Sequence, residues 1–181
     1  MNQATIVQAV KNWLETVVVG LNLCPFAKRE LVKDRIRFVV STATTEAGLL
    51  ADLHEELERL NADAGIETTL LIHPRVLQKF GAYVEFLAEA DGLIEHFDLD
   101  GVYQIASFHP EYQFAGTRAG DVENMTNRSP YPLLHLLREH SLDKAIADYP
   151  DVERIPERNI ARMEQMGTVT MQALLQACIV K

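Results

Sequence analysis

The chain has 181 residues, of which 48% are hydrophobic and 24% are charged, and its formal net charge is −9. This length and composition are ordinary for a globular protein with a substantial core, so we expect residues 1–181 to form a single domain. The acidic balance argues against non-specific binding of nucleic acid, which depends on a basic face that neutralises phosphates. No apolar run approaches the roughly 20 residues of a membrane span, so we expect no membrane partner.

The beginning of the chain and its cysteines indicate a cellular compartment. The first residues lack a basic region followed by an apolar stretch, so we expect no signal peptide. The two cysteines, Cys24 and Cys178, are too few for a disulfide scaffold. We therefore expect a cytoplasmic protein with free thiols. The sequence indicates neither a cofactor nor an oligomeric state.

Three short apolar runs, rich in β-branched residues, predict strands. They are Ile36–Ser41, Thr68–Ile72 and Val102–Phe108. The segments between them have apolar residues at helical spacing, from Thr44 or Thr45 to Gly65 and from Val76 to about His96. Strands that alternate with long helices are typical of β-α-β units with right-handed crossovers. We therefore predict an α/β fold with a small three-stranded, parallel β-α-β-α-β sheet flanked by helices.

Additional helices are predicted at both ends of the chain. Apolar residues from Ile6 to Val18 recur at helical spacing, and Pro25 suits the first turn of a short helix that ends near Val32. After the sheet we expect helices over Leu133–His140 and Leu142–Tyr149, a linker over Pro150–Pro156, and a last helix that carries Ile160 to Cys178 on one side.

The loop after the third predicted strand is the expected functional region. More than twenty residues there show no clear period. Structureless loops longer than about 12–15 residues are uncommon in compact domains and are usually functional or disordered. Because Tyr112, Phe114 and Tyr131 can bury large surfaces, we expect this loop to be ordered and to pack on the domain.

Polar residues follow the predicted strands. Ser41, His73 and His109 stand at the ends of the three runs, and each histidine precedes a proline that ends its strand. In a parallel sheet the three would share the carboxyl edge, where α/β proteins bind ligands. His73 is either a ligand-binding residue or an incidental polar residue. His109 is the candidate general acid or base, because the ordinary pKa of histidine lies near 6.5.

Cys24 is the candidate nucleophile. Pro25 places it at or near a helix N-terminus, where the dipole and free N–H groups lower the pKa of a thiol. The alternative is a packed, inert thiol, because Leu23 and Phe26 flank it and cysteine is among the most buried residue types. Both interpretations remain open from the sequence.

The end of the long loop is the candidate anion site. Ser129 suits the N-cap of the predicted helix at Leu133, and a helix N-terminus favours an anion. Arg128, with Asn127, would supply the donors that recognise phosphate or carboxylate. Alternatively, Arg128 pairs with Asp121 or Glu123. The other candidate ligand-binding residues of the loop are Tyr112, Arg118 and Asn124.

Metal and nucleotide fingerprints are missing from the sequence. The chain has no G-x-G-x-x-G after the first predicted strand, and its histidines and cysteines do not repeat at short metal-ligand spacing. We assign no metal ligands. A metal site assembled across the fold from Cys24, His73 and His109 remains an alternative.

Four segments together resemble a bacterial family catalogued as domain of unknown function 1415. They are Asn22–Ala27, Ile72–Pro74, Phe108–Phe114 and Thr126–Pro132. The resemblance extends over nearly the whole chain and implies a small cytoplasmic protein. It supplies no activity, cofactor or substrate.

These observations lead to three hypotheses. The first is an enzyme acting on a small anionic molecule that bears phosphate or carboxylate, in a pocket built by the 107–132 loop. The second is a module that binds a small ligand or a metal without chemistry. The third is a protein-interaction domain, in which Tyr112, Phe114 and Tyr131 form a partner surface.

Overall fold

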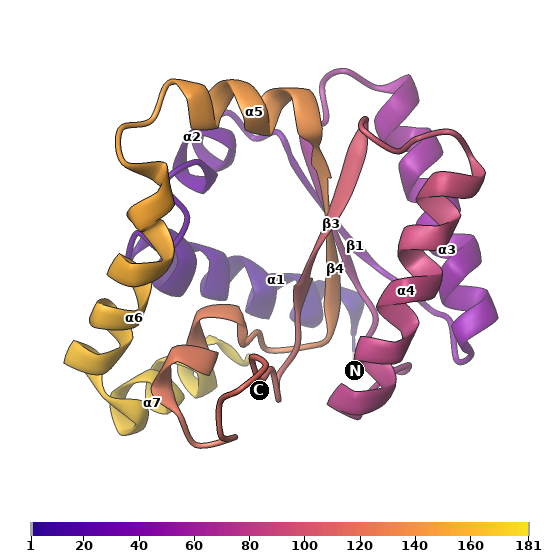
Figure 1. Ribbon diagram of the computed structural model, residues 1–181. Coiled ribbons are helices and arrows are strands. Elements are labelled where there is room, and N and C mark those ends of the chain that lie inside the picture. Colours follow the sequence, from indigo (N-terminus) through magenta and orange to yellow (C-terminus); the bar gives the residue numbers. More distant parts are fainter. Residues whose placement is uncertain (1, 181) are drawn as a thin grey trace.

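The computed structural model describes residues 2–180 and contains a four-stranded sheet with helices on both faces (Figure 1). The strand order is β1-β2-β4-β3. The strands are β1 (Ile36–Val40), β2 (Thr68–Ile72), β3 (Tyr103–Phe108) and β4 (Leu133–Arg138). β1 pairs with β2 in parallel, whereas β4 runs antiparallel to both β2 and β3. β1, β2 and β3 therefore share one direction, although β4 separates β2 from β3.

Two long helices cover one face of the sheet. α3 (Glu46–Ala62) connects β1 to β2, and α4 (Phe80–His96) connects β2 to β3. The Thr45 hydroxyl caps α3 by accepting the N–H of Gly48 at 3.1 Å. Leucines of α3 and aromatic residues of α4 form one core with the sheet. Its largest members are Tyr83, Tyr103 and Phe86, which pack with Leu49, Leu53, Leu57 and Leu134.

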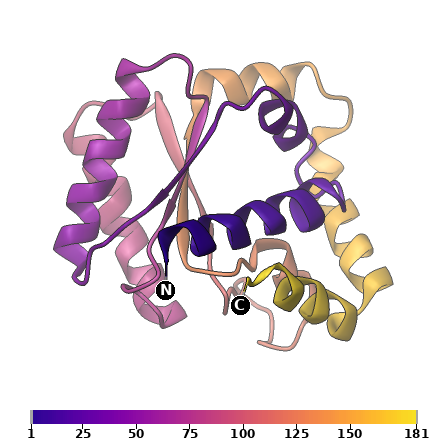
Figure 2. The same ribbon diagram turned by 180° about the vertical axis from the view of Figure 1, so that it is seen from behind.

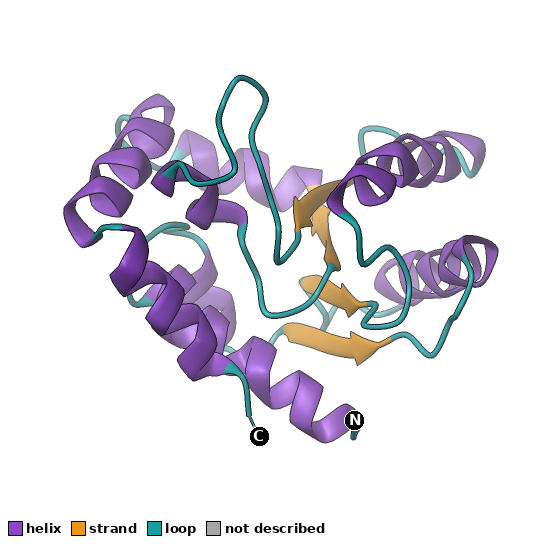
Figure 3. Cartoon of the chain, turned by 90° about the horizontal axis from the view of Figure 1, so that it is seen from below, coloured by secondary structure: helices purple, strands orange, loops and turns teal. Residues whose placement is uncertain are grey.

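The two ends of the chain cover the other face, as Figures 2 and 3 show. α1 (Gln3–Trp13) continues into a π-helical segment, η1 (Leu14–Val19). Helix α7 (Thr168–Cys178) packs beside it, and α6 (Ile155–Met166) packs against α7. The second core joins Trp13, Met163 and Met171 to Ile72 and Leu133 of the sheet. The remaining short helices are α2 (Ala27–Val32), α5 (Glu139–Ala147), η2 (Val122–Asn127) and η3 (Val152–Arg154).

The α/β fold is confirmed, but the predicted three-stranded parallel sheet is wrong: the sheet has four strands, and only β1 and β2 pair in parallel. The segment Leu133–Arg138, predicted as the start of a helix, is the inner strand β4. Leu133 faces one core, and Leu134 and Leu136 face the other. A strand buried on both faces loses the alternation of polar and apolar residues that identifies strands in a sequence.

The C-terminal part of the prediction also needs correction. The expected single last helix is two helices, α6 and α7, divided at Gly167, whose φ is +76°. That left-handed conformation suits glycine and ends α6. The predicted linker Pro150–Pro156 ends inside α6, because Pro156 occupies its first turn. None of the helices in residues 2–180 combines the length and the apolar character needed to cross a membrane.

Candidate functional site

The structure brings the ends of the three predicted strands to one edge of the sheet. Val40 lies opposite Ile72, and both Ile72 and Phe108 lie opposite Leu133. The next residues of β1, β2 and β3 are Ser41, His73 and His109, and all three are buried. Both histidine rings pack against Tyr83, with centroid distances of 5.7 Å for His73 and 5.2 Å for His109. The expected meeting of these residues at the carboxyl edge is therefore confirmed.

His109 uses both ring nitrogens within the protein. Nε2 donates to the carbonyl of Leu77 at 3.1 Å, and Nδ1 accepts the N–H of Glu111 at 2.9 Å. Burial lowers the pKa of His109, which favours the neutral ring. A general acid or base must reach a proton of its substrate. The assignment of His109 as that group stays a prediction, and it requires one of these two bonds to open.

His73 is held more simply. Nδ1 donates to the carbonyl of Val76 at 3.0 Å, whereas the buried Nε2 has no hydrogen-bond partner within residues 2–180. Burial lowers the pKa of His73 to about 4. The ring is therefore neutral at pH 7, and its role in ligand binding stays a prediction.

The 107–132 loop packs back on the domain, as expected. Asn124 is buried at its centre: Oδ1 accepts the N–H of Phe114 and the hydroxyl of Thr117, both at 2.9 Å, and Nδ2 donates to the carbonyl of Arg118 at 2.7 Å. Asn127 donates to the carbonyl of Ser107 at 3.1 Å and closes the base of the loop. Both side chains that were candidates for ligand binding thus hold the loop together.

Arg128 also serves the loop. Its Nε donates to the carbonyl of Tyr112 at 3.2 Å, and its Nη2 donates to the carbonyl of Ala119 at 2.7 Å. The Ser129 hydroxyl donates to the carbonyl of Tyr131 at 2.7 Å. Because the segment that follows is β4, the helix N-terminus predicted there does not exist. The predicted anion site therefore has no helix N-terminus, and the guanidinium of its arginine is hydrogen-bonded to backbone carbonyl groups.

The aromatic residues of this loop are packed against the domain. The Tyr112 ring lies 5.1 Å from that of Phe80 on α4 and 4.9 Å from that of Phe114. The Tyr112 hydroxyl is 3.3 Å from that of Ser107. The backbone N–H of Arg118 donates to Asp121 at 2.7 Å, which turns the loop back toward η2.

Cys24 lies in another part of the molecule. Its side chain packs against the core beneath α1, α6 and α7, whereas Leu77, Phe80 and Tyr83 around His109 belong to the core of α3 and α4. Burial raises the pKa of the Cys24 thiol, and the N–H groups of Phe26 and Ala27 only partly oppose that shift. The proposed attack by Cys24 with His109 as its base stays a prediction to which this geometry lends no support.

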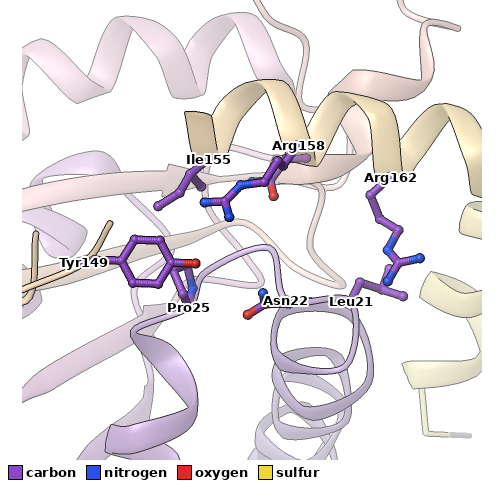
Figure 4. Close-up of a pocket in the computed structure, with 8 residues that line it drawn as sticks. Leu21, Asn22, Pro25, Tyr149, Ile155, Arg158 and Arg162 are labelled. Atoms are coloured by element: carbon purple, nitrogen blue, oxygen red, sulfur yellow. The ribbon is translucent and has the colours of Figure 1, made fainter. Parts of the chain in front are cut away.

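A cavity of about 170 Å³ opens beside the Cys24 segment, between the turn after η1 and the start of α6 (Figure 4). Arg158 and Arg162 project from α6 toward the turn, and Asn22 lies between them in this view. The cavity is lined by Leu21, Asn22, Pro25, Tyr149, Ile155, Arg158, Asn159 and Arg162. It combines two cationic side chains and an amide with apolar walls.

The two arginines of the cavity lack acidic partners. Arg158 stacks on Tyr149, with its guanidinium carbon 5.6 Å from the ring centroid, and the Tyr149 ring is braced edge-on by Phe26. Arg162 contacts the amide oxygen of Gln165 at 3.3 Å. Neither side chain forms an ion pair within the described residues 2–180. Their positive charge remains available to a ligand.

The shape of the turn follows from two local features. η1 is a π-helix, a wider coil that occurs mostly as short segments at functional sites. At its end, a Cβ on Gly20 would lie 2.3 Å from the carbonyl oxygen of Thr16, so only glycine fits there. The buried Asn159 then donates to the carbonyl of Leu23 at 2.9 Å and ties the turn to α6. Asn22, with φ of +56°, is held in the left-handed region.

Sequence reasoning missed this cavity, although two signals were present. Arg158 and Arg162 are spaced i,i+4, which places two like charges on one helix face at a cost in stability. Asn22 and Pro25 belong to the Asn22–Ala27 motif, in which only Cys24 was considered as a candidate site residue.

No three His, Cys, Asp or Glu side chains within the described part of the chain gather in a way that could hold a metal ion. This statement includes the set Cys24, His73 and His109. The alternative of a metal site assembled from these three residues is therefore not supported by their positions within the described residues.

Comparison with known proteins places the chain in a family. Residues 5–173 match the family described as "Protein of unknown function (DUF1415)". The chain belongs to this family. The resemblance drawn from the four motifs is confirmed. No curated protein and no solved structure matches the chain.

Proposed function

We propose that the protein binds a small anionic molecule in the cavity between the Leu21–Pro25 turn and α6. The observation that carries the proposal is the pair Arg158 and Arg162, which line one cavity and form no ion pair within residues 2–180. Arginine is suited to phosphate and carboxylate because its planar fork donates two parallel hydrogen bonds. Both side chains are exposed, so a ligand reaches them from solvent.

A second cavity gives a useful contrast. It measures about 370 Å³ and is lined in part by Lys11, Arg35 and Arg37. Arg37 is bound to Glu56 through two hydrogen bonds, at 2.6 and 2.9 Å, and Arg35 pairs with Glu30 and Glu67. Its arginines are neutralised by the protein itself. The cavity at α6 is therefore the better candidate for an anion.

The test compares thermal unfolding in phosphate, acetate and chloride at equal ionic strength. A ligand that binds the folded state raises the unfolding temperature, and the stabilisation grows with the logarithm of the ligand concentration above Kd. We expect phosphate or acetate to stabilise the protein beyond chloride, and the double variant R158Q/R162Q to lose that difference. Equal stabilisation by all three salts, or an unchanged difference in the double variant, would overturn the proposal.

Catalysis at this cavity is not part of the proposal. The enzymatic hypothesis for the 107–132 loop stays a prediction, as do a cytoplasmic location and the lack of nucleic-acid binding. The aromatic side chains Tyr112 and Phe114 pack on the domain and on each other, which weakens the case for an aromatic partner surface on this loop.

A further inference from the structure

The side chains that line the α6 cavity indicate the chemistry of the ligand beyond its charge. Arg158, Arg162 and Asn22 supply hydrogen-bond donors, whereas Leu21, Pro25 and Ile155 supply apolar surface around the same space. Ligand sites of this type hold a polar group with a few directed donors and bury the remainder of the ligand against apolar side chains. The lining thus fits a molecule with one anionic end and one apolar end.

The number of arginines bears on the anionic end. One guanidinium satisfies both oxygens of a carboxylate through two parallel bonds. A phosphate monoester has three terminal oxygens and a charge between about −1.5 and −2 at pH 7, so it can engage two guanidinium groups and an amide together. Arg158 and Arg162 stand one helical turn apart on α6, and Figure 4 shows Asn22 on the turn that faces them across the cavity.

The supports behind these donors fix their position. Arg158 is stacked on Tyr149, which reduces the rotamer freedom that a long side chain would otherwise lose on binding. Asn159 is 9% exposed and holds the carbonyl of Leu23, so the backbone that carries Asn22 is tied to the helix that carries both arginines. The two backbone segments that carry the donors are therefore held together, and the Arg158 side chain is held on Tyr149, before any ligand arrives.

The size of the cavity limits the apolar end. At about 170 Å³ it is smaller than the 300–1,000 Å³ of pockets that take drug-sized ligands. We infer that the ligand is a phosphate monoester with a short uncharged chain. This inference rests on the proposed function and names the chemical class that the same cavity selects.

Calorimetric titration with three probes tests it: propyl phosphate, butyrate and inorganic phosphate. We expect propyl phosphate to bind at least tenfold more tightly than butyrate, and several-fold more tightly than inorganic phosphate, which cannot use the apolar wall. Arg158→Gln and Arg162→Gln should each weaken propyl phosphate at least tenfold. Arg158→Lys should recover only part of that loss, because lysine keeps the charge without the fork or the stacking on Tyr149.

The matched control is Arg75→Gln, which removes the same charge from an exposed arginine on the loop before α4 and should leave binding unchanged. Butyrate binding as tight as propyl phosphate, and equally dependent on both arginines, would overturn the phosphate class and leave the proposed function intact. Equal affinity for inorganic and propyl phosphate would overturn the apolar end. Failure of all three probes to bind would overturn both the inference and the proposed function.

Discussion

The 107–132 loop and the α6 cavity contain the same kinds of polar side chain but use them in opposite ways. In the loop, the side chains of Asn124 and Arg128 form hydrogen bonds with backbone carbonyls and N–H groups of the loop itself. In the cavity, Asn22 and Arg158 face solvent, and their support comes from Asn159 and Tyr149 behind them. A long loop without regular structure needs such internal partners, because its backbone groups have no ladder to satisfy them. Polar residues of a loop therefore identify a binding site only when their hydrogen-bonding groups are not already bonded within the protein.

The largest expected effect concerns Asn124. Asn124 is buried, and Asn124→Ala removes the partner of the Phe114 N–H, of the Thr117 hydroxyl and of the Arg118 carbonyl. Since each unmade buried hydrogen bond costs about 1–3 kcal/mol, we expect the free energy of unfolding to fall by about 3–5 kcal/mol in urea denaturation. The matched change in the cavity is Asn22→Gly, which tolerates the positive φ and should cost less than about 0.5 kcal/mol. Similar losses at the two positions would refute the contrast between loop and cavity.

Acid should destabilise the fold through its buried histidines; burial lowers the pKa of His73, and also that of His135 on β4, to about 4. The pKa of His73 in the folded state is about 4, below its ordinary value of 6.5, so the unfolded chain binds more protons between these values. The stabilisation is fully present above pH 6.5 and is lost as the pH falls toward 4, to a total of about 3 kcal/mol. We expect His73→Gln, whose amide can donate to Val76, to flatten the decrease in unfolding free energy between pH 6.5 and 4. An identical slope in wild type and variant would contradict this prediction.

The two arginines should separate stability from binding. Arg128→Gln breaks charged hydrogen bonds to the Tyr112 and Ala119 carbonyls, and we expect a loss of about 2–3 kcal/mol in the free energy of unfolding. Arg158→Gln should change that free energy by less than about 0.5 kcal/mol, since its side chain is exposed. Phosphate-dependent stabilisation should show the reverse pattern: retained in the Arg128 variant and reduced in the Arg158 variant. A phosphate response that disappears only with Arg128 would move the candidate site back to the loop.

Gly20 offers the smallest and most local test. In Gly20→Ala the new Cβ meets the Thr16 carbonyl, so the end of η1 must shift, at a cost of about 1–3 kcal/mol. The shift should displace the Leu21–Pro25 turn and weaken anion binding. Gly81→Ala is the control, because a Cβ there meets nothing within 4 Å and alanine favours the helix. Gly20→Ala with unchanged stability and unchanged binding would show that the π-helical end does not shape the cavity.

The parts of the fold that could be predicted have local signals. β-branched residues identify β1, and the helical spacing of leucines identifies α3. β4 escaped prediction because its partners β2 and β3 come from elsewhere in the chain, and because the two helix layers bury both of its faces. Four leucines in six residues then look as much like a helix as a strand.

The site shows the same limit. The meeting of His73 and His109 followed from the common direction of their strands and was predictable. The α6 cavity depends on the approach of Asn22 to Arg158 across more than a hundred residues, which no local pattern encodes. The sequence also could not reveal that the Arg128 guanidinium donates its hydrogen bonds to backbone carbonyl oxygens.

The position of β4 bears on how the chain can fold during its synthesis. β4 is the last strand to leave the ribosome, yet it fills the place between β2 and β3. Until residue 138 has emerged, β3 has no strand beside it, and β2 (Thr68–Ile72), which is buried along its whole length in the finished fold, has one edge unpaired. Unpaired apolar edges invite pairing with other chains. A nascent chain that stalls within the 107–132 loop therefore exposes an aggregation-prone intermediate, and completing the sheet depends on that loop closing before a foreign strand arrives.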